Sequence, residues 1–245
     1  MMLNFGIGYL FGQRTDVTNV GPDNFGVLQD NSIEFSFESK ELYSQLQFPI
    51  DVARGKGKVT GKAKLARIFG ALYADLFFGT TLSTGENNVS VNEAHTATAT
   101  VTVTNSTSYL SDLGVYFTSA ANLRMNYTTG ALSSGSYATN NSGVYSFFSG
   151  DFGKGIAISY TYTDAGGKTI TLTNNIMGYT PTWQGTFYAN HNTQGASGSM
   201  TLLLNQCVSD KLSFPTKIDG YTEMDFDYKA FSNAAGSLGS FSVTE

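Results

Sequence analysis

Alternation of apolar and polar residues is the feature of this sequence that most restricts its fold. Residues 32–38 read SIEFSFE, and residues 223–228 read EMDFDY. Because successive side chains of a strand point to opposite faces of a sheet, both segments predict β-strands with one buried face. The chain also has 27 glycines and only 13% charged residues, which indicates a mainly β protein with many turns.

A change of period predicts one flanking α-helix at residues 61–78. Leu65, Leu72 and Leu76 fall at helical spacing there, and Gly79 follows as a helix stop.

The next segments suggest how the chain is divided. Residues 80–95 resemble a linker, and residues 95–164 carry few charges and predict short strands joined by turns. We therefore expect a main β domain from residues 1–94 plus 165–245, with a small inserted β domain at 95–164.

The sequence offers few groups for catalysis. His95 and His191 are its only histidines, and no nucleophile motif or glycine-rich phosphate loop occurs. Cys207 is the only cysteine, so no intrachain disulfide can form, and we expect this small residue to be buried. We expect no enzyme activity, cofactor or metal site. No apolar run reaches the ~18 residues of a membrane span, so no membrane partner is expected.

The basic residues are concentrated in one short segment. Residues 54–67 hold six of the fourteen basic residues and no acidic one, and these six are Arg54, Lys56, Lys58, Lys62, Lys64 and Arg67. We expect the first three to share one face of a strand and the last three to lie in the first turns of the helix, where the helix dipole disfavours cations. A nucleic-acid patch and a patch between subunits are both open. The net charge of −5 and the absence of interleaved aromatic residues favour the patch between subunits.

An acidic stripe, Glu223, Asp225 and Asp227, lies near the C-terminus. Its spacing does not match a calcium-binding loop, and nothing nearby would separate the pKa values of its carboxyl groups for acid–base chemistry. Three interpretations stay open. The stripe is a solvated strand face, a surface complementary to the basic segment of this or a neighbouring subunit, or a wall that repels polyanions.

Two long segments resemble the major tail tube proteins of long-tailed bacteriophages. One is SIEFSFESKELYSQLQFPIDVARGKGKVTGKAKLARIFGALYADLFFG, and the other is FPTKIDGYTEMDFDYKAFSNAAGSLGSFSVTE. The middle of the chain, with LSDLGVYF, GSYATNNSGVYSF and GKGIAISYTYT, resembles a β insert of predicted phage structural proteins.

This resemblance implies a fold, an assembly and a function. The fold is a β-sandwich or barrel-like pair of sheets with one flanking helix. Subunits close into rings, usually of six, and the rings stack into a tube with an acidic lumen that guides DNA. The segment Lys40–Gln47, which includes Lys40, Glu41, Leu42 and Tyr43, would be a hairpin tip that reaches the next ring. Glu223, Asp225 and Asp227 become candidates for the lumen or for the seam between subunits.

We therefore expect a structural protein of the virion tail, made in the cytoplasm of a host bacterium. Its partners would be copies of itself, other tail proteins and DNA that is enclosed without being specifically bound. The inserted domain should face outward, because a bulky domain in the bore would block passage. One alternative is another virion β protein, such as a head decoration or tail terminator subunit. A second is a carbohydrate-binding or adhesin module that uses Trp183, which we otherwise expect in the core, together with exposed tyrosines.

Overall fold

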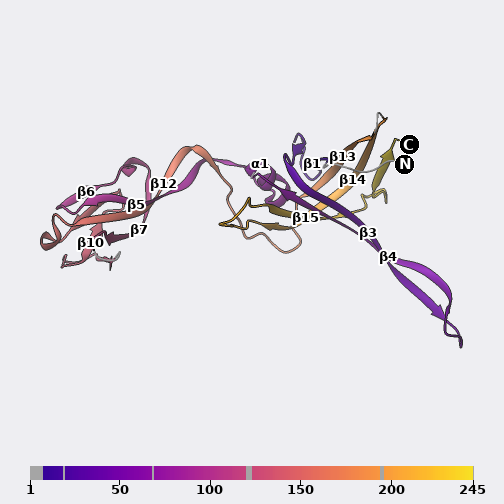
Figure 1. Cartoon of the computed structure of the whole chain (residues 1–245), viewed down its shortest axis with the longest axis horizontal. Helices are drawn as coiled ribbons and strands as arrows, with labels where there is room; N and C mark the ends of the chain where they lie inside the picture. The colour runs from indigo at the N-terminus through magenta and orange to yellow at the C-terminus, as the bar shows by residue number, and fades with distance from the viewer. Residues whose placement is uncertain (1–7, 19, 68, 120–122, 194–195, 245) are drawn as a thin grey trace. The chain divides into compact units, whose positions relative to one another are not determined.

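The chain forms two compact units, a body and an inserted unit. The structure, a computed structural model, describes residues 8–18, 20–67, 69–119, 123–193 and 196–244. The body is Met1–Leu82 plus Ile170–Glu245, and the inserted unit is Ser83–Thr169 (Figure 1). The expected boundaries at 94/95 and 164/165 fall inside two strands, because the segment expected as a linker pairs with the end of the insertion.

The body is built on one eight-stranded sheet whose neighbouring strands are antiparallel. The strand order is β2-β1-β13-β14-β15-β4-β3, and β16 pairs with another part of β14. The strands are β1 (Tyr9–Arg14), β2 (Asp23–Asn24), β3 (Leu28–Tyr43), β4 (Pro49–Leu65), β13 (Thr182–Thr193), β14 (Ala196–Ser213), β15 (Met224–Phe231) and β16 (Gly239–Val243).

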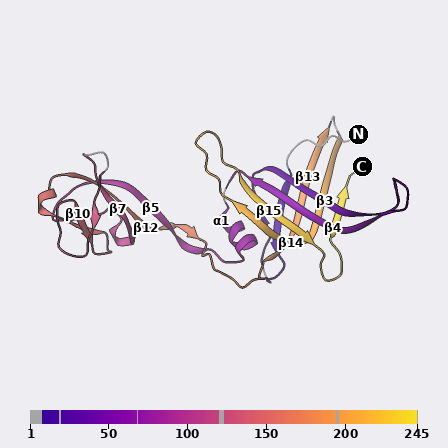
Figure 2. The same ribbon diagram turned by 90° about the horizontal axis from the view of Figure 1, so that it is seen from below.

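This sheet is strongly twisted, so that β13 and β14 run across the direction of β3 and β4 (Figure 2), and its two edge strands approach each other. The edge strands β2 and β3 are joined by residues 25–27 alone, which can span at most about 14 Å. The amide of Phe25 donates to the carbonyl of Leu10 at 3.0 Å, and the amide of Ala66 donates to the carbonyl of Val27 at 3.1 Å. The predicted mainly β architecture is confirmed.

The concave side of the sheet holds an apolar core that a short helical segment completes. The segment consists of α1 (Gly70–Leu72) and a π-helical turn (Tyr73–Phe78), and Leu72, Tyr73 and Leu76 are buried in the core. It ends at Gly79, whose φ of 66° is left-handed and therefore favours glycine. The predicted helix stop is confirmed.

The predicted helix start is wrong, because residues 61–65 are the end of β4. Ala63 and Leu65 are buried there, while Lys62 and Lys64 lie on the other face. A short run in which every second residue is apolar fits a strand as well as one side of a helix. Its pairing with β3 on one side and β15 on the other decides between the two.

The strands β3 and β4 continue beyond the body as a long hairpin. They pair from Leu28 and Leu65 out to Tyr43 and Pro49, but β15 accompanies β4 only from Val59 to Leu65. Residues 35–58 therefore form a two-stranded projection, called here the distal hairpin (Figure 1).

The inserted unit is a sandwich of two four-stranded sheets. One sheet has the order β6-β11-β10-β9 and the other β5-β12-β7-β8. Buried residues of both sheets, among them Val101, Tyr145, Val115 and Ile158, share one core. The strands are β5 (Ser83–Thr96), β6 (Thr100–Thr102), β7 (Tyr109–Phe117), β8 (Leu123–Arg124), β9 (Asn126–Tyr127), β10 (Ser136–Thr139), β11 (Val144–Phe147) and β12 (Gly155–Thr169).

Candidate assembly surface

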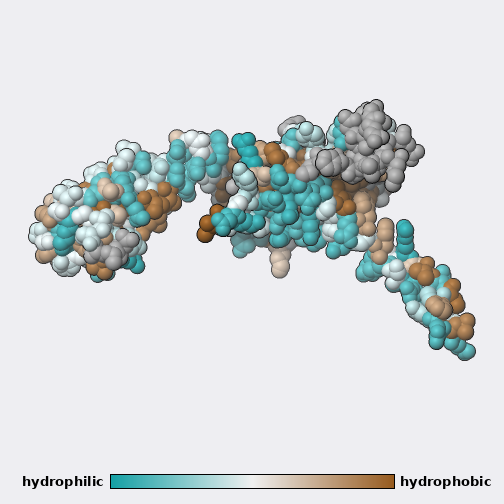
Figure 3. All heavy atoms as spheres, in the orientation of Figure 1, coloured by the Kyte–Doolittle hydropathy of each residue, from teal (hydrophilic) through white to brown (hydrophobic). Residues whose placement is uncertain are grey.

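The distal hairpin exposes a large amount of apolar surface (Figure 3). Near its end, Phe48 is 80% exposed and Leu46 is 72% exposed. The exposed large apolar residues of the hairpin are Phe35, Phe37, Leu42, Tyr43, Leu46, Phe48, Ile50 and Val52. Such a concentration of exposed large apolar side chains indicates an interaction site rather than a solvated loop.

One face of the distal hairpin is continuous with the face of β3 that packs against the core of the body. Phe35 pairs with Val59 and Phe37 with Gly57, on the same face as the partly buried Ile33. A β-carbon at position 57 would lie 2.9 Å from the Phe37 ring, which explains a glycine there. The alternation predicted for residues 32–38 holds, but the apolar face is buried only where the body covers it.

The segment Lys40–Gln47, expected as a hairpin tip, is a turn only in its second half. The structure extends β3 to Tyr43 and resumes pairing at Pro49. The signal for the second strand is present in the sequence, because Phe48, Ile50 and Val52 occupy alternate positions.

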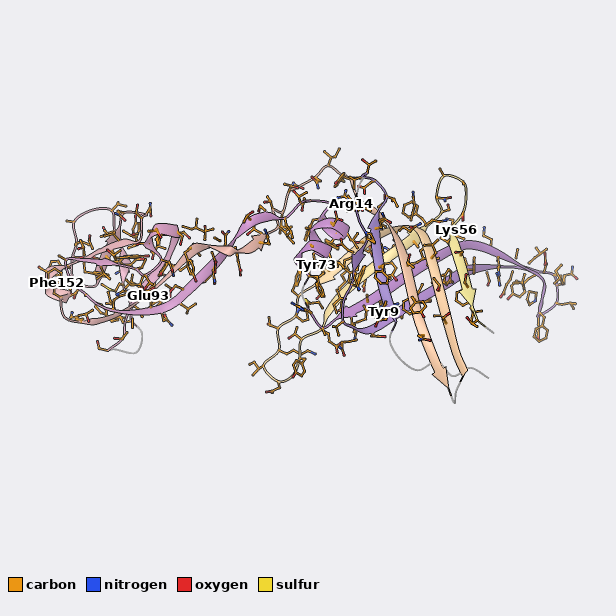
Figure 4. All side chains as sticks on the ribbon, turned by 90° about the horizontal axis from the view of Figure 1, so that it is seen from above. Tyr9, Arg14, Lys56, Tyr73, Glu93 and Phe152 are labelled. Carbon is orange, nitrogen blue, oxygen red and sulfur yellow. The ribbon has the colours of Figure 1, made fainter. Side chains whose placement is uncertain are left out.

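The six residues of the basic segment do not lie on one surface. Between Phe37 and Ser39 the register of the hairpin shifts, because Gly57 pairs with Phe37 while Arg54 pairs with Ser39. This bulge turns Arg54 to the apolar face, where its guanidinium lies 4.8 Å from the centre of the Phe37 ring. Lys58, opposite Ser36, and Lys56, on the other side of Gly57, remain on the opposite face, so the expectation that these three cations share a face is wrong. Lys56 is labelled in Figure 4.

Lys62 and Lys64 lie beside the acidic stripe of the same subunit. In the sheet register Lys62 is opposite Asp227 and Lys64 is opposite Asp225. The Lys64 ammonium is 3.6 Å from a Glu223 carboxylate oxygen, and both side chains are more than 40% exposed. Exposed pairs of this kind contribute about 0–1 kcal/mol, so they influence pairing specificity more than stability.

Arg67 follows β4 and precedes the helix, with its guanidinium 5.4 Å from the centre of the Phe69 ring. Because Lys62 and Lys64 are in a strand, the expected conflict with the helix dipole does not arise for them. The last four residues of β3, next to the turn, are all exposed, and they are Lys40, Glu41, Leu42 and Tyr43. The Tyr43 hydroxyl donates a hydrogen bond to the Glu41 carboxylate.

The outward face of the sheet carries alternating columns of charge. Lys64 of β4 stands between Asp30 of β3 and Asp225 of β15, and Lys62 is opposite Asp227 of β15. Lys211 of β14 is 3.8 Å from Asp225. The charged residues of these columns are Asp30, Glu34, Lys62, Lys64, Asp210, Lys211, Glu223, Asp225, Asp227 and Lys229. Carboxylates outnumber lysines, so this face is mildly acidic.

Three carboxylates of the inserted unit, those of Glu93, Asp112 and Asp151, each accept several hydrogen bonds. Buried Asp151 accepts from the amide of Gly135 at 2.7 Å and pairs with Lys154 at 2.6 Å. Asp112 accepts from the hydroxyls of Tyr137 at 2.5 Å and Tyr145 at 3.0 Å. These roles were not predicted from the sequence, although a rare carboxylate in a segment almost free of charge is itself a signal for a buried, hydrogen-bonded group.

Glu93 is the most heavily bonded of these carboxylates (Figure 4). It accepts from the hydroxyl of Tyr160 at 2.6 Å, the amide of Thr104 at 2.9 Å and the ring of His95 at 2.7 Å. Burial raises the pKa of Glu93, but these hydrogen bonds outweigh burial and lower the pKa from 4.5 to about 2. The oxygens of this carboxylate already accept hydrogen bonds from several groups of the protein, so Glu93 has a structural role in holding these groups together.

We expect Glu93→Gln to destabilise the inserted unit in a pH-dependent way. A carboxylate whose pKa is lowered by folding stabilises the protein above its unfolded pKa, and this contribution is lost as the pH falls from about 4.5 toward 2. The difference in melting temperature between wild type and variant should therefore be full at pH 7 and shrink toward pH 2. Glu86→Gln, at an exposed position of the same strand, is the control. A difference that is constant across this range would contradict the role of Glu93.

The remaining candidate residues that the structure describes are buried or hydrogen-bonded within the protein. Trp183 is fully buried, with its indole nitrogen donating to the Ser209 hydroxyl at 3.1 Å, so it offers no platform for stacking on a sugar. Cys207 is buried as predicted. His95 contacts Glu93, and the side chain of His191 lies outside the described residues.

Two further features bear on function. Within the described residues, the His, Cys, Asp and Glu side chains form no group of three or more that could hold a metal ion. The helices of this part of the chain are all too short or too polar to cross a membrane.

Comparison with known proteins adds no relative. No protein-family model matches the chain, and no curated protein matches it in sequence. Its function must therefore be inferred from its own surfaces.

Proposed function

We propose that this chain is a structural subunit that associates with copies of itself into stacked rings, which form the tail tube of a long-tailed bacteriophage. The rings would contain six copies, contact other tail proteins and enclose DNA during ejection. The subunit would be made in the cytoplasm of the host bacterium and act in the virion tail.

The observation that carries this proposal is the apolar surface of the distal hairpin. Burying one large apolar side chain contributes about 1.5–3 kcal/mol, and eight such residues are exposed between positions 35 and 52. A protein that functions as a monomer gains nothing from this surface and risks aggregation. A subunit that must join others needs it.

The charged outward face is compatible with a conduit for DNA. DNA carries dense negative charge, so a cationic bore would retain it through phosphate contacts. On this face each lysine column is flanked by carboxylates, which reduces its attraction for phosphate. The face is a candidate for the lumen or for the seam between subunits, with Glu223, Asp225 and Asp227 at its centre.

Electron microscopy of the purified protein over a range of concentrations tests the proposal. Rings that stack into tubes of uniform diameter are the expected result. Rings that never stack would favour a terminator subunit, and a strict monomer at all concentrations would refute self-assembly. The carbohydrate-binding alternative has lost its proposed aromatic platform, because Trp183 is buried.

Two charge reversals separate assembly from folding. Lys56→Glu changes an exposed residue of the distal hairpin, so we expect weaker self-association at low salt and partial recovery at high salt, where charges between subunits are screened. Lys64→Glu brings a third carboxylate beside Glu223 and Asp225, so we expect it to lower thermal stability instead. Sedimentation velocity and thermal unfolding measure the two effects. Assembly of Lys56→Glu that does not depend on salt would exclude this residue from an electrostatic seam.

A further inference from the structure

The body contains a hollow beside the base of the distal hairpin, and most of the side chains that line it are apolar, although Asp30 and Asn31 line it as well. The hollow has a volume of about 340 Å³ and lies between β3 on one side and β13, β14 and β16 on the other. A second hollow of about 120 Å³ adjoins it and shares Phe35, Leu202 and Phe241 with it. Together they form an apolar groove. Its main apolar lining residues are Ile33, Phe35, Phe187, Met200, Leu202 and Phe241.

Polar groups with no partner lie along this groove. Asn31 lines it and is opposite buried Ala63 in the sheet register, and neither its amide nitrogen nor its amide oxygen has a hydrogen-bond partner among the described residues. Shielded amide groups of this kind are normally hydrogen-bonded.

The edge of the groove is also open. Among the described strands, β14 is the only one that pairs with β16, and all five residues of β16 are exposed. A neighbouring backbone could add to this edge.

The end of the distal hairpin has the complementary properties. Leu46 and Phe48, two of its most exposed apolar side chains, lie in the segment 44–48 that joins β3 to β4. This segment forms no part of the strand pairing. The amide of Leu46 donates to the Ser44 hydroxyl at 3.2 Å, and the other backbone groups of the segment can donate to and accept from the side-chain amide of Asn31.

The tip of a given subunit is far from that subunit's own groove. Leu46 at the tip is eleven positions after Phe35, which lines the groove, and at about 3.3 Å per position this corresponds to roughly 36 Å. The continuous pairing of β3 with β4 keeps the hairpin extended, so the tip can meet such a groove only on another copy.

We propose that residues 44–48 of one copy dock in the apolar groove of a second copy, with Leu46 and Phe48 in the hollow. The proposal rests on the self-association proposed above and identifies the surface that receives the hairpin. The tip and the groove are different surfaces of the same chain, so a pair of copies joined by one such contact still has one free tip and one free groove. Further copies can add to both, and contacts of this kind therefore build open polymers or closed rings. Copies joined in this way should be offset by roughly the reach of the hairpin, about 36 Å.

The first test removes the two anchor side chains. We expect Leu46→Ser/Phe48→Ser to raise the protein concentration required for assembly by about a hundredfold or more, without lowering the melting temperature of the body. Val91→Ser removes an equally exposed apolar side chain from the inserted unit (69% exposed) and should leave assembly unchanged. Assembly of the double variant at the wild-type concentration would overturn the proposal.

The second test locates the acceptor. With Phe48→Cys and Phe241→Cys in one chain, mild oxidation of assembled protein should give a ladder of covalent multimers on non-reducing gels, because tip and groove alternate along the assembly. Phe48→Cys with Lys211→Cys places the second thiol on the outward face and should give no ladder. Cys207 is buried and can be left in place.

The outcomes distinguish this proposal from the function on which it rests. Tubes without a ladder, or equal ladders from both cysteine pairs, would overturn the tip-in-groove contact and leave the tail tube proposal standing. A ladder without tubes would support the contact and contradict the tail tube. A wild-type protein that never assembles, and gives no ladder, would refute both.

Discussion

Replacing Trp183 by alanine should lower the free energy of unfolding of the body by about 3–5 kcal/mol. Trp183 packs against Phe25 and Tyr228, with ring centres 5.8 and 5.1 Å away. Its indole nitrogen donates to Ser209, whose hydroxyl donates in turn to the carbonyl of Leu76 at 2.7 Å. The substitution therefore leaves a cavity in the core and breaks the hydrogen-bonded link between sheet and helix.

Calorimetry can detect this effect in the body alone. Each unit has its own core, so we expect two unfolding transitions, of which only that of the body should fall, by roughly 10 °C. Tyr145→Ala, which removes a fully buried ring from the inserted unit, should lower only the other transition. A Trp183→Ala protein with an unchanged body transition and a lost affinity for glycans would instead support a sugar-binding platform.

Removing the inserted unit should leave the body folded and able to self-associate. Ser83 pairs with Thr169, and Asn87 pairs with Thr163, so the chain enters and leaves the insertion at neighbouring positions. Deleting residues 88–162 and joining the ribbon through an Asn-Gly turn keeps this pairing. If the insertion faces outward, the tubes should be thinner in electron micrographs while the diameter of their bore is unchanged.

The matched deletion removes the outer part of the distal hairpin instead. Replacing residues 40–53 by the same two-residue turn should abolish assembly and leave the inserted unit and the melting of the body unchanged. A deletion of the insertion that prevents assembly, or a deletion of the hairpin that permits it, would assign the two segments the opposite roles.

Local sequence patterns predicted part of this structure correctly. The alternation of residues 223–228 predicted a strand with Phe226 and Tyr228 buried, and both are at most 1% exposed. Gly79 ends the helix as predicted because only the geometry of its own turn is involved. Each of these predictions depends on residues within a few positions of one another.

The misplaced features depend on partners that are distant in the sequence. Residues 61–65 are a strand because β15, more than 150 positions later, pairs with them. Arg54 lies on a different face from Lys58 because a bulge in the hairpin shifts the register. The glycines at positions 55 and 57 suggest a bulge or a close backbone approach, but they do not indicate which side chain the bulge turns over. The inserted unit is longer at both ends than expected for the same reason. Its first strand, β5, pairs with its last strand, β12, and most of the unit lies between these two strands in the sequence.

The sequence by itself determined that the chain is mainly β, that it contains an inserted β segment and that its basic residues are concentrated in residues 54–67. Only the tertiary structure decided what those basic residues meet. Strand pairing places Lys62 and Lys64 beside the acidic stripe, and it carries Arg54, Lys56 and Lys58 out on the distal hairpin. The physical reason is that the charge of a residue is local, whereas its neighbours in a sheet are set by register between strands far apart in the chain.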